Sequence, residues 1–284
     1  MTAPAHLLSP ARVGVCSWSL RAESPADLLA KVQACGVRRV QIHLDPIRSL
    51  AWRADQVGDM FRNANIRLVS GMMSMKDEDY STLESIKATG GIRPDATWEV
   101  NLKNADGNAI MAARLGIELV TFHAGFLPHE KGDAERTKMI ERLAQLAEIY
   151  AARRVKLGLE TGQENARTLL GVLEELNALL PATAQVGVNF DPANMILYGM
   201  GDPVEAAAML APHIVQVHIK DANPSDSLGE WGVEMPAGRG SVRWDAFLGT
   251  LAKAGYRGNF IIERESGEAR VEDVAAARVL VTGA

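Results

Sequence analysis

The sequence predicts an α/β protein in which eight parallel strands close into a (β/α)8 barrel. Eight short apolar segments alternate with longer segments of helical periodicity, a pattern typical of parallel strands joined by helical crossovers. The number of strands matches a closed barrel. An open doubly wound sheet would be expected to carry a glycine-rich phosphate loop after its first strand, and "CSWSLRAESP" contains none.

Strands and helices follow in order along the chain. Short apolar runs predict the strands, which are expected at 13–18, 37–43, 66–72, 118–123, 155–160, 186–191, 214–219 and 259–263. Apolar residues at helical spacing predict the helices, which are expected at 25–34, 52–64, 133–153, 166–180, 203–210 and 243–254. In 133–153, for example, Asp133 can cap the first turn.

One connection is longer than the others. Residues 73–117 join the third strand to the fourth and contain two further helical patterns, near 79–88 and 97–115. A decorated loop and a lid or dimer contact remain alternatives for this segment. No internal repeat or composition shift marks a second domain, so we expect a single TIM-barrel domain over residues 1–284.

Composition and charge limit the partners. The chain has 30 Lys and Arg against 35 Asp and Glu, a net charge of −5, and it lacks a basic run that could neutralise a phosphate backbone. Two cysteines are too few for a disulfide framework, and no apolar run approaches the length of a membrane span. The start "MTAPAHLLSP" resembles no secretion signal. We therefore expect a cytoplasmic protein without nucleic-acid or membrane partners. A homo-oligomer is compatible with this composition.

Four consecutive strands end on residues of the types that bind metals. The fifth strand ends on Glu160, the sixth on Asp191, the seventh on His218 and the eighth on Glu263. One such ending is common, because strands often stop at a solvated polar residue. In a barrel the carboxyl ends of all strands converge on one mouth, so four successive endings limited to Glu, Asp and His predict a shared site.

Several segments also resemble a known group of proteins. "FHAG", "LGLETGQEN", "VNFDPANM", "VHIKD" and "IIERE" are similar to signature segments of the xylose-isomerase-like TIM barrel superfamily, the sugar phosphate isomerase/epimerase family. This group includes sugar isomerases, ketose 3-epimerases, hydroxypyruvate isomerase, inosose dehydratase and endonuclease IV-type repair enzymes. The resemblance covers nearly the whole chain. It implies that Glu160, Asp191, His218 and Glu263 bind one divalent cation.

The departures from this pattern disfavour a nuclease. The repair endonucleases hold three zinc ions and need extra ligands, including a histidine where this chain has Asn194. The third strand ends at Gly71-Met72-Met73, and "SLGEWGVEMPAGRG" contains neither Asp nor His. Asn194 also departs from those epimerases that place a substrate-binding histidine at this position.

Three carboxylates and one imidazole form an oxygen-rich site. Such a site favours Mn²⁺, with Mg²⁺, Co²⁺ and Zn²⁺ as alternatives. The sequence therefore predicts a divalent-metal-dependent sugar or polyol isomerase or epimerase. It would abstract a proton next to a carbonyl through a metal-stabilised enediolate, with Glu160 and Glu263 as base and acid. The alternatives are a dehydratase or lyase that acts on a keto-sugar or inosose, a non-catalytic sugar-binding barrel and an endonuclease IV-like nuclease.

Six further residues form the expected substrate-binding set: His123, Asn194, His43, Trp18, Asp221 and Arg239. His123 resembles a superfamily position that touches substrate or assists proton transfer. His43 ends the second strand, where a substrate contact and a structural role are equal alternatives. Trp18 could stack on a sugar or pack in the core.

The remaining assignments lie beyond the seventh and eighth strands. Asp221 could orient His218 or bind a hydroxyl, and Arg239 in "GRG" could reach an anionic substrate group. Lys220 is expected to point outward and to be structural if the strand continues through it. Glu265 follows Glu263 by two residues on the same side of the strand, so either could be the ligand. We prefer Glu263 because it ends the apolar run.

Overall fold

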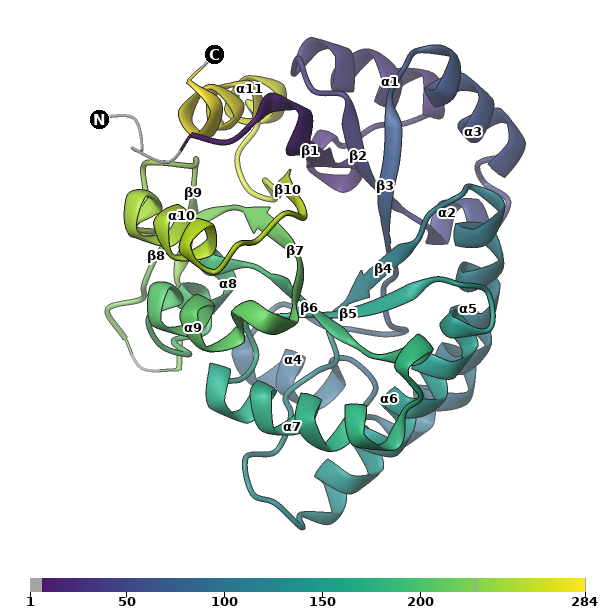
Figure 1. The fold of residues 1–284 in the computed structure, drawn as a ribbon, viewed down its shortest axis with the longest axis vertical. Helices are drawn as coiled ribbons and strands as arrows, with labels where there is room; N and C mark the ends of the chain where they lie inside the picture. The colour runs from purple at the N-terminus through teal and green to yellow at the C-terminus, as the bar shows by residue number, and fades with distance from the viewer. Residues whose placement is uncertain (1–6, 228, 284) are drawn as a thin grey trace.

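The computed structural model describes residues 7–227 and 229–283. Eight parallel strands close into a barrel in the order β1-β10-β7-β6-β5-β4-β3-β2 (Figure 1). Their bounds are β1 Val13–Cys16, β2 Arg39–His43, β3 Arg67–Met72, β4 Leu119–Phe122, β5 Lys156–Glu160, β6 Gly187–Phe190, β7 Ile214–Ile219 and β10 Asn259–Ile262. The predicted (β/α)8 barrel is confirmed, and each barrel strand lies within its predicted range.

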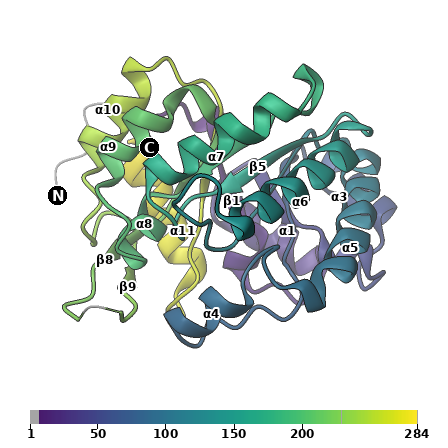
Figure 2. The same cartoon turned by 90° about the horizontal axis from the view of Figure 1, so that it is seen from below.

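Helices surround the barrel (Figures 1 and 2). Their bounds are α1 Pro25–Ala34, α2 Asp45–Arg48, α3 Ala54–Asn63, α4 Leu83–Thr89, α5 Asp95–Arg114, α6 Ala134–Ala151, α7 Ala166–Leu179, α8 Pro192–Leu197, α9 Pro203–Leu210, α10 Trp244–Lys253 and α11 Arg270–Thr282. The six helices predicted between strands are present. Side-chain caps begin several of them; Asp133, for example, accepts hydrogen bonds from the amides of Glu135 and Arg136 before α6.

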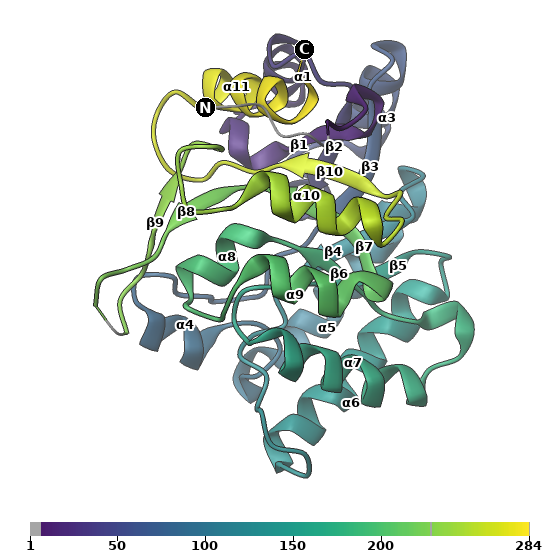
Figure 3. The ribbon, with the colours of Figure 1, turned by 60° about the vertical axis from the view of Figure 1, so that its left-hand side comes forward.

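A short antiparallel hairpin and three helices were not predicted from the sequence. The hairpin consists of β8 (Asp221–Asn223) and β9 (Val233–Met235), within the connection from β7 to β10. The helices are α2, α8 and α11. In Figures 2 and 3 the hairpin lies at the same end of the barrel as α4, which belongs to the long connection after β3. Both segments therefore border the mouth formed by the carboxyl ends of the strands.

The interior of the barrel is polar beneath this mouth. Gln41, Ser70, Asn189 and Gln216 are completely buried and come from four different strands. Ser70 Oγ donates to Gln216 Oε1 at 2.6 Å, and Gln216 Nε2 donates to Gln41 Oε1 at 2.9 Å and to Asn189 Oδ1 at 3.2 Å. Because buried polar groups are costly unless they are paired, this network is expected to hold the side chains above it in fixed orientations.

No helix in the described part of the chain is both long and apolar enough to cross a membrane. The cytoplasmic location, the absence of a nucleic-acid partner and the homo-oligomer stay predictions.

Candidate functional site

The four residues expected to bind a metal meet at the mouth of the barrel. Glu160 ends β5, Asp191 follows β6, His218 lies near the end of β7, and Glu263 follows β10. His218 Nδ1 lies 3.4 Å from Glu160 Oε1, 3.3 Å from Asp191 Oδ2 and 3.3 Å from Glu263 Oε2. One ligand atom from each of the four lies within 4.8 Å of the others, and all four residues are buried. This cluster could hold a single cation.

Protein donors orient the carboxylates of Asp191 and Glu160. Asp191 Oδ1 accepts hydrogen bonds from the amides of Ala193 and Asn194 at 2.8 and 2.9 Å, which also begins α8. Glu160 Oε2 accepts a hydrogen bond from Asn189 Nδ2 at 3.1 Å, and its Oε1 accepts one from Asn194 Nδ2 at 3.0 Å. Asp191 Oδ2 and Glu160 Oε1 approach His218, so each carboxylate presents one oriented oxygen to the centre of the cluster.

Protein donors hold both oxygens of Glu263. Its Oε1 accepts a hydrogen bond from Trp18 Nε1 at 2.7 Å, and its Oε2 accepts one from Lys220 Nζ at 2.9 Å and approaches His218 Nδ1. Burial opposes ionisation, but the charges of Lys220 and His218 outweigh it and hold the pKa of Glu263 well below its usual range. Burial also opposes ionisation of Glu160, whose pKa is nonetheless lowered by His123 and His218. Both glutamates are therefore anions at neutral pH.

The polar barrel interior sets the tautomer of His218. Its Nε2 lies 2.8 Å from Gln41 Oε1, which can only accept a hydrogen bond. Gln41 is fixed in this orientation because its Nε2 donates to Thr121 Oγ1 at 2.7 Å. Asn189 Nδ2 lies 3.0 Å from the same histidine nitrogen and donates to Glu160. Burial opposes a charge on His218, but Cys16 and the neighbouring carboxylates outweigh it and raise the pKa of His218 well above its usual value. A cation would replace the proton on Nδ1, while Gln41 holds the proton on Nε2.

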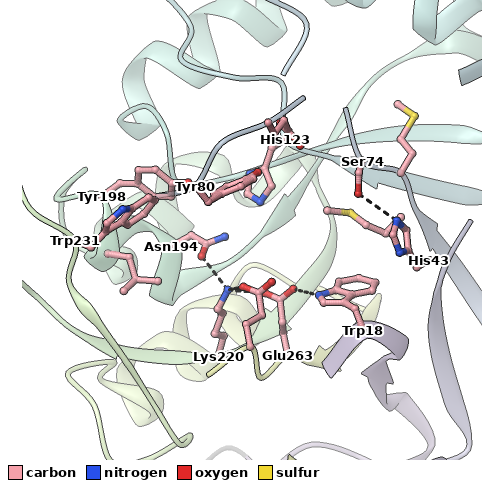
Figure 4. A pocket seen from close by; sticks show the side chains of 15 residues that line it. Trp18, His43, Ser74, Tyr80, His123, Asn194, Tyr198, Lys220, Trp231 and Glu263 are labelled. Atoms are coloured by element: carbon pink, nitrogen blue, oxygen red, sulfur yellow. Dashed lines mark hydrogen bonds and ion pairs between the residues drawn. The ribbon is translucent and has the colours of Figure 1, made fainter. Parts of the chain in front are cut away.

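A cavity of about 410 Å³ opens above this cluster (Figure 4). Five of the residues that the sequence placed in the site line it: Trp18, His43, His123, Asn194 and Glu263. The other lining residues are Met72, Met73, Ser74, Glu78, Tyr80, Leu197, Tyr198, Lys220, Trp231 and Glu265. Met73, Ser74, Glu78 and Tyr80 belong to the long connection after β3, so this segment forms part of the cavity wall.

The two histidines that line the cavity differ in their partners. His123 Nε2 lies 3.4 Å from Glu160 Oε1, and its buried Nδ1 has no hydrogen-bond partner. His43 Nε2 lies 2.9 Å from Asp45 Oδ2 and 3.1 Å from Ser74 Oγ. His123 therefore connects Glu160 with the cavity, whereas His43 is held by Asp45 and Ser74.

Lys220 does not point outward as the sequence analysis expected. It is buried at the cavity, where its Nζ donates to Glu263 Oε2 at 2.9 Å, Glu265 Oε2 at 2.5 Å and Asn194 Oδ1 at 3.2 Å (Figure 4). The expectation misapplied the alternation of the strand, because residues two apart point to the same side and Lys220 therefore follows His218 into the mouth.

Asp221 lies away from the cavity, which departs from its expected role as a substrate ligand. Its Oδ1 accepts hydrogen bonds from the amides of Ala222 and Val242 at 2.9 and 3.0 Å. Its Oδ2 accepts hydrogen bonds from the amide of Gly238 at 2.8 Å and from Trp244 Nε1 at 3.0 Å. With four protein donors on a buried carboxylate, Asp221 fixes the loop that follows the hairpin and contacts neither His218 nor a hydroxyl in the cavity.

Arg239 also departs from the expectation. Its side chain is exposed outside the cavity lining, and its amide closes a turn onto Pro236. Of the two glutamates that were alternatives on the eighth barrel strand, Glu263 approaches His218 Nδ1. Glu265 lies beyond Lys220, where half of its side chain is exposed. This geometry favours Glu263 as the ligand.

The cavity also contains residues that the sequence analysis did not assign. Tyr198 follows α8, and Trp231 lies in the loop between β8 and β9. Their rings meet edge to face with centroids 4.7 Å apart. Strand ends are marked in the sequence by the end of an apolar run, but aromatic residues in loops carry no comparable signal.

The chain belongs to the xylose isomerase-like TIM barrel family, whose sequence profile matches residues 23–280. It is 32% identical to the "Rhizopine catabolism protein MocC" of Rhizobium meliloti over 138 residues, which cover 44% of this chain and 41% of that protein. It is 28% identical to the "Putative L-ribulose-5-phosphate 3-epimerase SgbU" of Escherichia coli (strain K12) over 186 residues, 63% of each protein. The matches thus span less than two thirds of both relatives.

Among solved structures, the fold is similar to a xylose isomerase domain protein from Planctomyces limnophilus. The TM-score is 0.83 at 31% sequence identity, and the match covers 90% of this chain and 91% of that chain.

Proposed function

We propose that the protein is a divalent-metal-dependent sugar or polyol isomerase or epimerase. The observation that carries this proposal is the convergence of Glu160, Asp191 and Glu263 on His218 Nδ1 at the floor of a cavity. The family and the 3-epimerase name of one relative support the same class of reaction.

The donor set fits one divalent cation, with Mn²⁺ favoured. Protein donors orient each carboxylate so that one of its oxygens faces His218 Nδ1, and His218 would present a lone pair to the same point once Nδ1 loses its proton. A cation bound there would polarise the carbonyl of a substrate and stabilise the negative charge that develops on its oxygen.

The residues around the cavity could move the proton. Glu263 borders the cavity directly, whereas Glu160 is buried behind it and reaches it through His123. We assign Glu263 and the Glu160–His123 pair to opposite faces of the substrate, one as base and the other as acid. Lys220 keeps its proton because its neighbouring carboxylates outweigh burial and raise its pKa well above its usual value. Its charge can therefore stabilise a developing alkoxide in the cavity.

Turnover in D₂O tests this mechanism. A panel of ketoses, keto-sugars and inososes is incubated with the Mn²⁺-loaded protein, and deuterium next to the carbonyl is measured by NMR. We expect incorporation that depends on metal. Glu160→Gln and Glu263→Gln should each lower turnover by roughly 10²–10⁴, because each retains shape but loses the proton carrier.

Glu160→Gln and Glu263→Gln should also differ in solvent exchange. The variant that retains the base should still exchange substrate hydrogen for deuterium without forming product, whereas the variant that lacks the base should neither exchange hydrogen nor form product. Glu265→Gln is the control for the ligand assignment, and it should retain metal. If product forms without deuterium from the solvent, the reaction proceeds by a hydride shift and the proton-transfer mechanism is wrong. Loss of water from the substrate would instead identify a dehydratase, and metal-dependent binding without exchange would identify a sugar-binding barrel.

A further inference from the structure

We propose that the substrate of this site is an uncharged, unphosphorylated keto-sugar or keto-polyol whose C–H surface packs against an aromatic wall. The inference rests on the proposed function, because it concerns the occupant of the same cavity. The evidence for it lies in the loops after the seventh and eighth barrel strands, because these two loops often bind phosphate in a (β/α)8 barrel. Here these loops follow β7 and β10.

These two loops present carboxylates where a phosphate would need cations. Glu263 and Glu265 of the β10 loop line the cavity, and Glu234 of β9 lies directly behind Glu265. Lys220 is the cation that the described residues of these loops place in the cavity, and it is shared between Glu263 and Glu265. A phosphate would therefore meet like charges, and in a partly buried site such repulsion is weakly screened.

The carboxylate of Glu234 occupies the place beside the β10 loop where a phosphate group would find hydrogen-bond donors. Its Oε1 accepts hydrogen bonds from the backbone amide of Glu265 at 2.9 Å and from Arg264 Nη1 at 2.6 Å. A loop amide and an arginine are the donors that commonly bind a phosphate. Arg264 is also held by Asp273, whose Oδ2 accepts from its Nε at 2.8 Å. The carboxylate of Glu234 thus blocks the donors that a phosphorylated substrate would use.

The helix that begins at the mouth offers no amides to a phosphate either. The first free amides of α8, those of Ala193 and Asn194, donate to Asp191 Oδ1. Anion binding at a helix N-terminus needs such donors to be available.

The opposite side of the cavity is aromatic. Tyr198, Trp231 and Tyr80 form this wall (Figure 4), and Leu197 also lines the cavity. Aromatic faces bind the C–H surface of a sugar. The wall thus suits a neutral polyhydroxylated compound.

Binding of matched pairs tests the inference. Fructose, ribulose, sorbitol and myo-inositol are each compared with their monophosphates, with the full-length chain both metal-free and Mn²⁺-loaded. Affinity is measured by tryptophan fluorescence and calorimetry. In the metal-free protein, where a phosphate cannot gain affinity from the ion, we expect the best neutral ligand to bind about tenfold or more tightly than its phosphate. Tighter binding of the phosphate, or binding of no neutral compound, would overturn the inference.

Variants locate the effect. Trp231→Leu should lower the affinity for the neutral ligand by about 2- to 10-fold. Trp98 lies outside the cavity, so Trp98→Phe should leave the affinity for this ligand unchanged. Glu265→Lys should raise the affinity for the phosphate relative to wild type by about tenfold or more. Glu234→Gln should act in the same direction, and Glu265→Lys keeps the test decisive if Glu234→Gln does not fold. No gain for the phosphate in Glu265→Lys would overturn the inference.

The two proposals fail in different ways. If no compound exchanges deuterium but neutral ligands bind preferentially, the isomerase is wrong and the ligand class stands. If only phosphorylated sugars exchange, the reaction class stands and the ligand class is wrong.

Discussion

Replacing Lys220 with methionine should lower the stability of the metal-free protein and increase the stabilisation that the protein gains from Mn²⁺. The ammonium lies 2.9 Å from Glu263 Oε2, and both side chains are about 3% exposed. At an effective dielectric constant of about 20, this separation corresponds to an attraction of about 6 kcal/mol. Part of that attraction offsets the cost of burying the lysine. The expected net loss is therefore about 3–5 kcal/mol, the usual result of breaking a buried ion pair.

The assay is thermal unfolding in EDTA and in Mn²⁺. In EDTA, Lys220→Met should lower Tm by roughly 6–15 °C. In Mn²⁺ most of this loss should be recovered, because Glu263 Oε2 no longer shares its charge with the lysine and the cation can neutralise the remaining carboxylates. The increase in Tm on adding Mn²⁺ should thus be larger for the variant than for wild type. An increase smaller than that of wild type would refute a cation site at Glu263.

Lys138→Met is the matched control. Lys138 also pairs with two carboxylates, Asp95 at 2.9 Å and Glu135 at 3.0 Å, but on the more exposed surface of α6. Exposed ion pairs contribute about 0–1 kcal/mol, so this variant should unfold close to wild type with an unchanged response to Mn²⁺.

Three further predictions address metal content, orientation and pH. Asp191→Ala should lose the divalent cation on dialysis, and metal analysis showing full occupancy would contradict the assignment. Gln41→Leu, which removes the acceptor of the His218 Nε2 proton, should weaken Mn²⁺ binding by about 10- to 100-fold in a metal titration while the ligands stay in place. Burial raises the pKa of Glu164 to about 8, so the folded state favours the neutral carboxyl. The contribution of this neutral carboxyl to stability is complete below about pH 4, and it is lost as the pH rises to about 8. Glu164→Gln should therefore gain stability relative to wild type by about 1.4 kcal/mol per pH unit in this window, measured by denaturant unfolding.

The barrel and the residues at its floor were predictable because they depend on local patterns. An apolar run that ends on Glu160 or Asp191 marks both the end of a strand and the side chain that follows it. Parallel strands in a closed barrel have a fixed register, in which Ile261 pairs with His218 and Glu160 pairs with Asn189. Strand ends that are distant in sequence thus come together once the topology is known.

The residues of the loops were not predictable in the same way. The period of two places Lys220 on the same face as His218, but it does not show that Lys220 pairs with Glu265 of another loop. Asp221 lies one residue further along and is turned away to bind loop amides. A difference of one residue in the end of a strand therefore exchanges a cavity residue for a structural one, because successive side chains point in opposite directions.

The buried charges at the mouth also bear on how many cations the site can hold. Glu160, Asp191 and Glu263 together carry three negative charges when ionised, and Lys220 supplies one positive charge; all four are buried. The remaining two negative charges equal the charge of one divalent ion, and leaving them uncompensated in the interior would cost several kcal/mol for each charge. In the absence of the ion this imbalance is relieved by protonation, since the surrounding carboxylates raise the pKa of His218 well above its usual value and burial raises the pKa of Asp191. The charge balance within this cluster therefore favours one divalent cation.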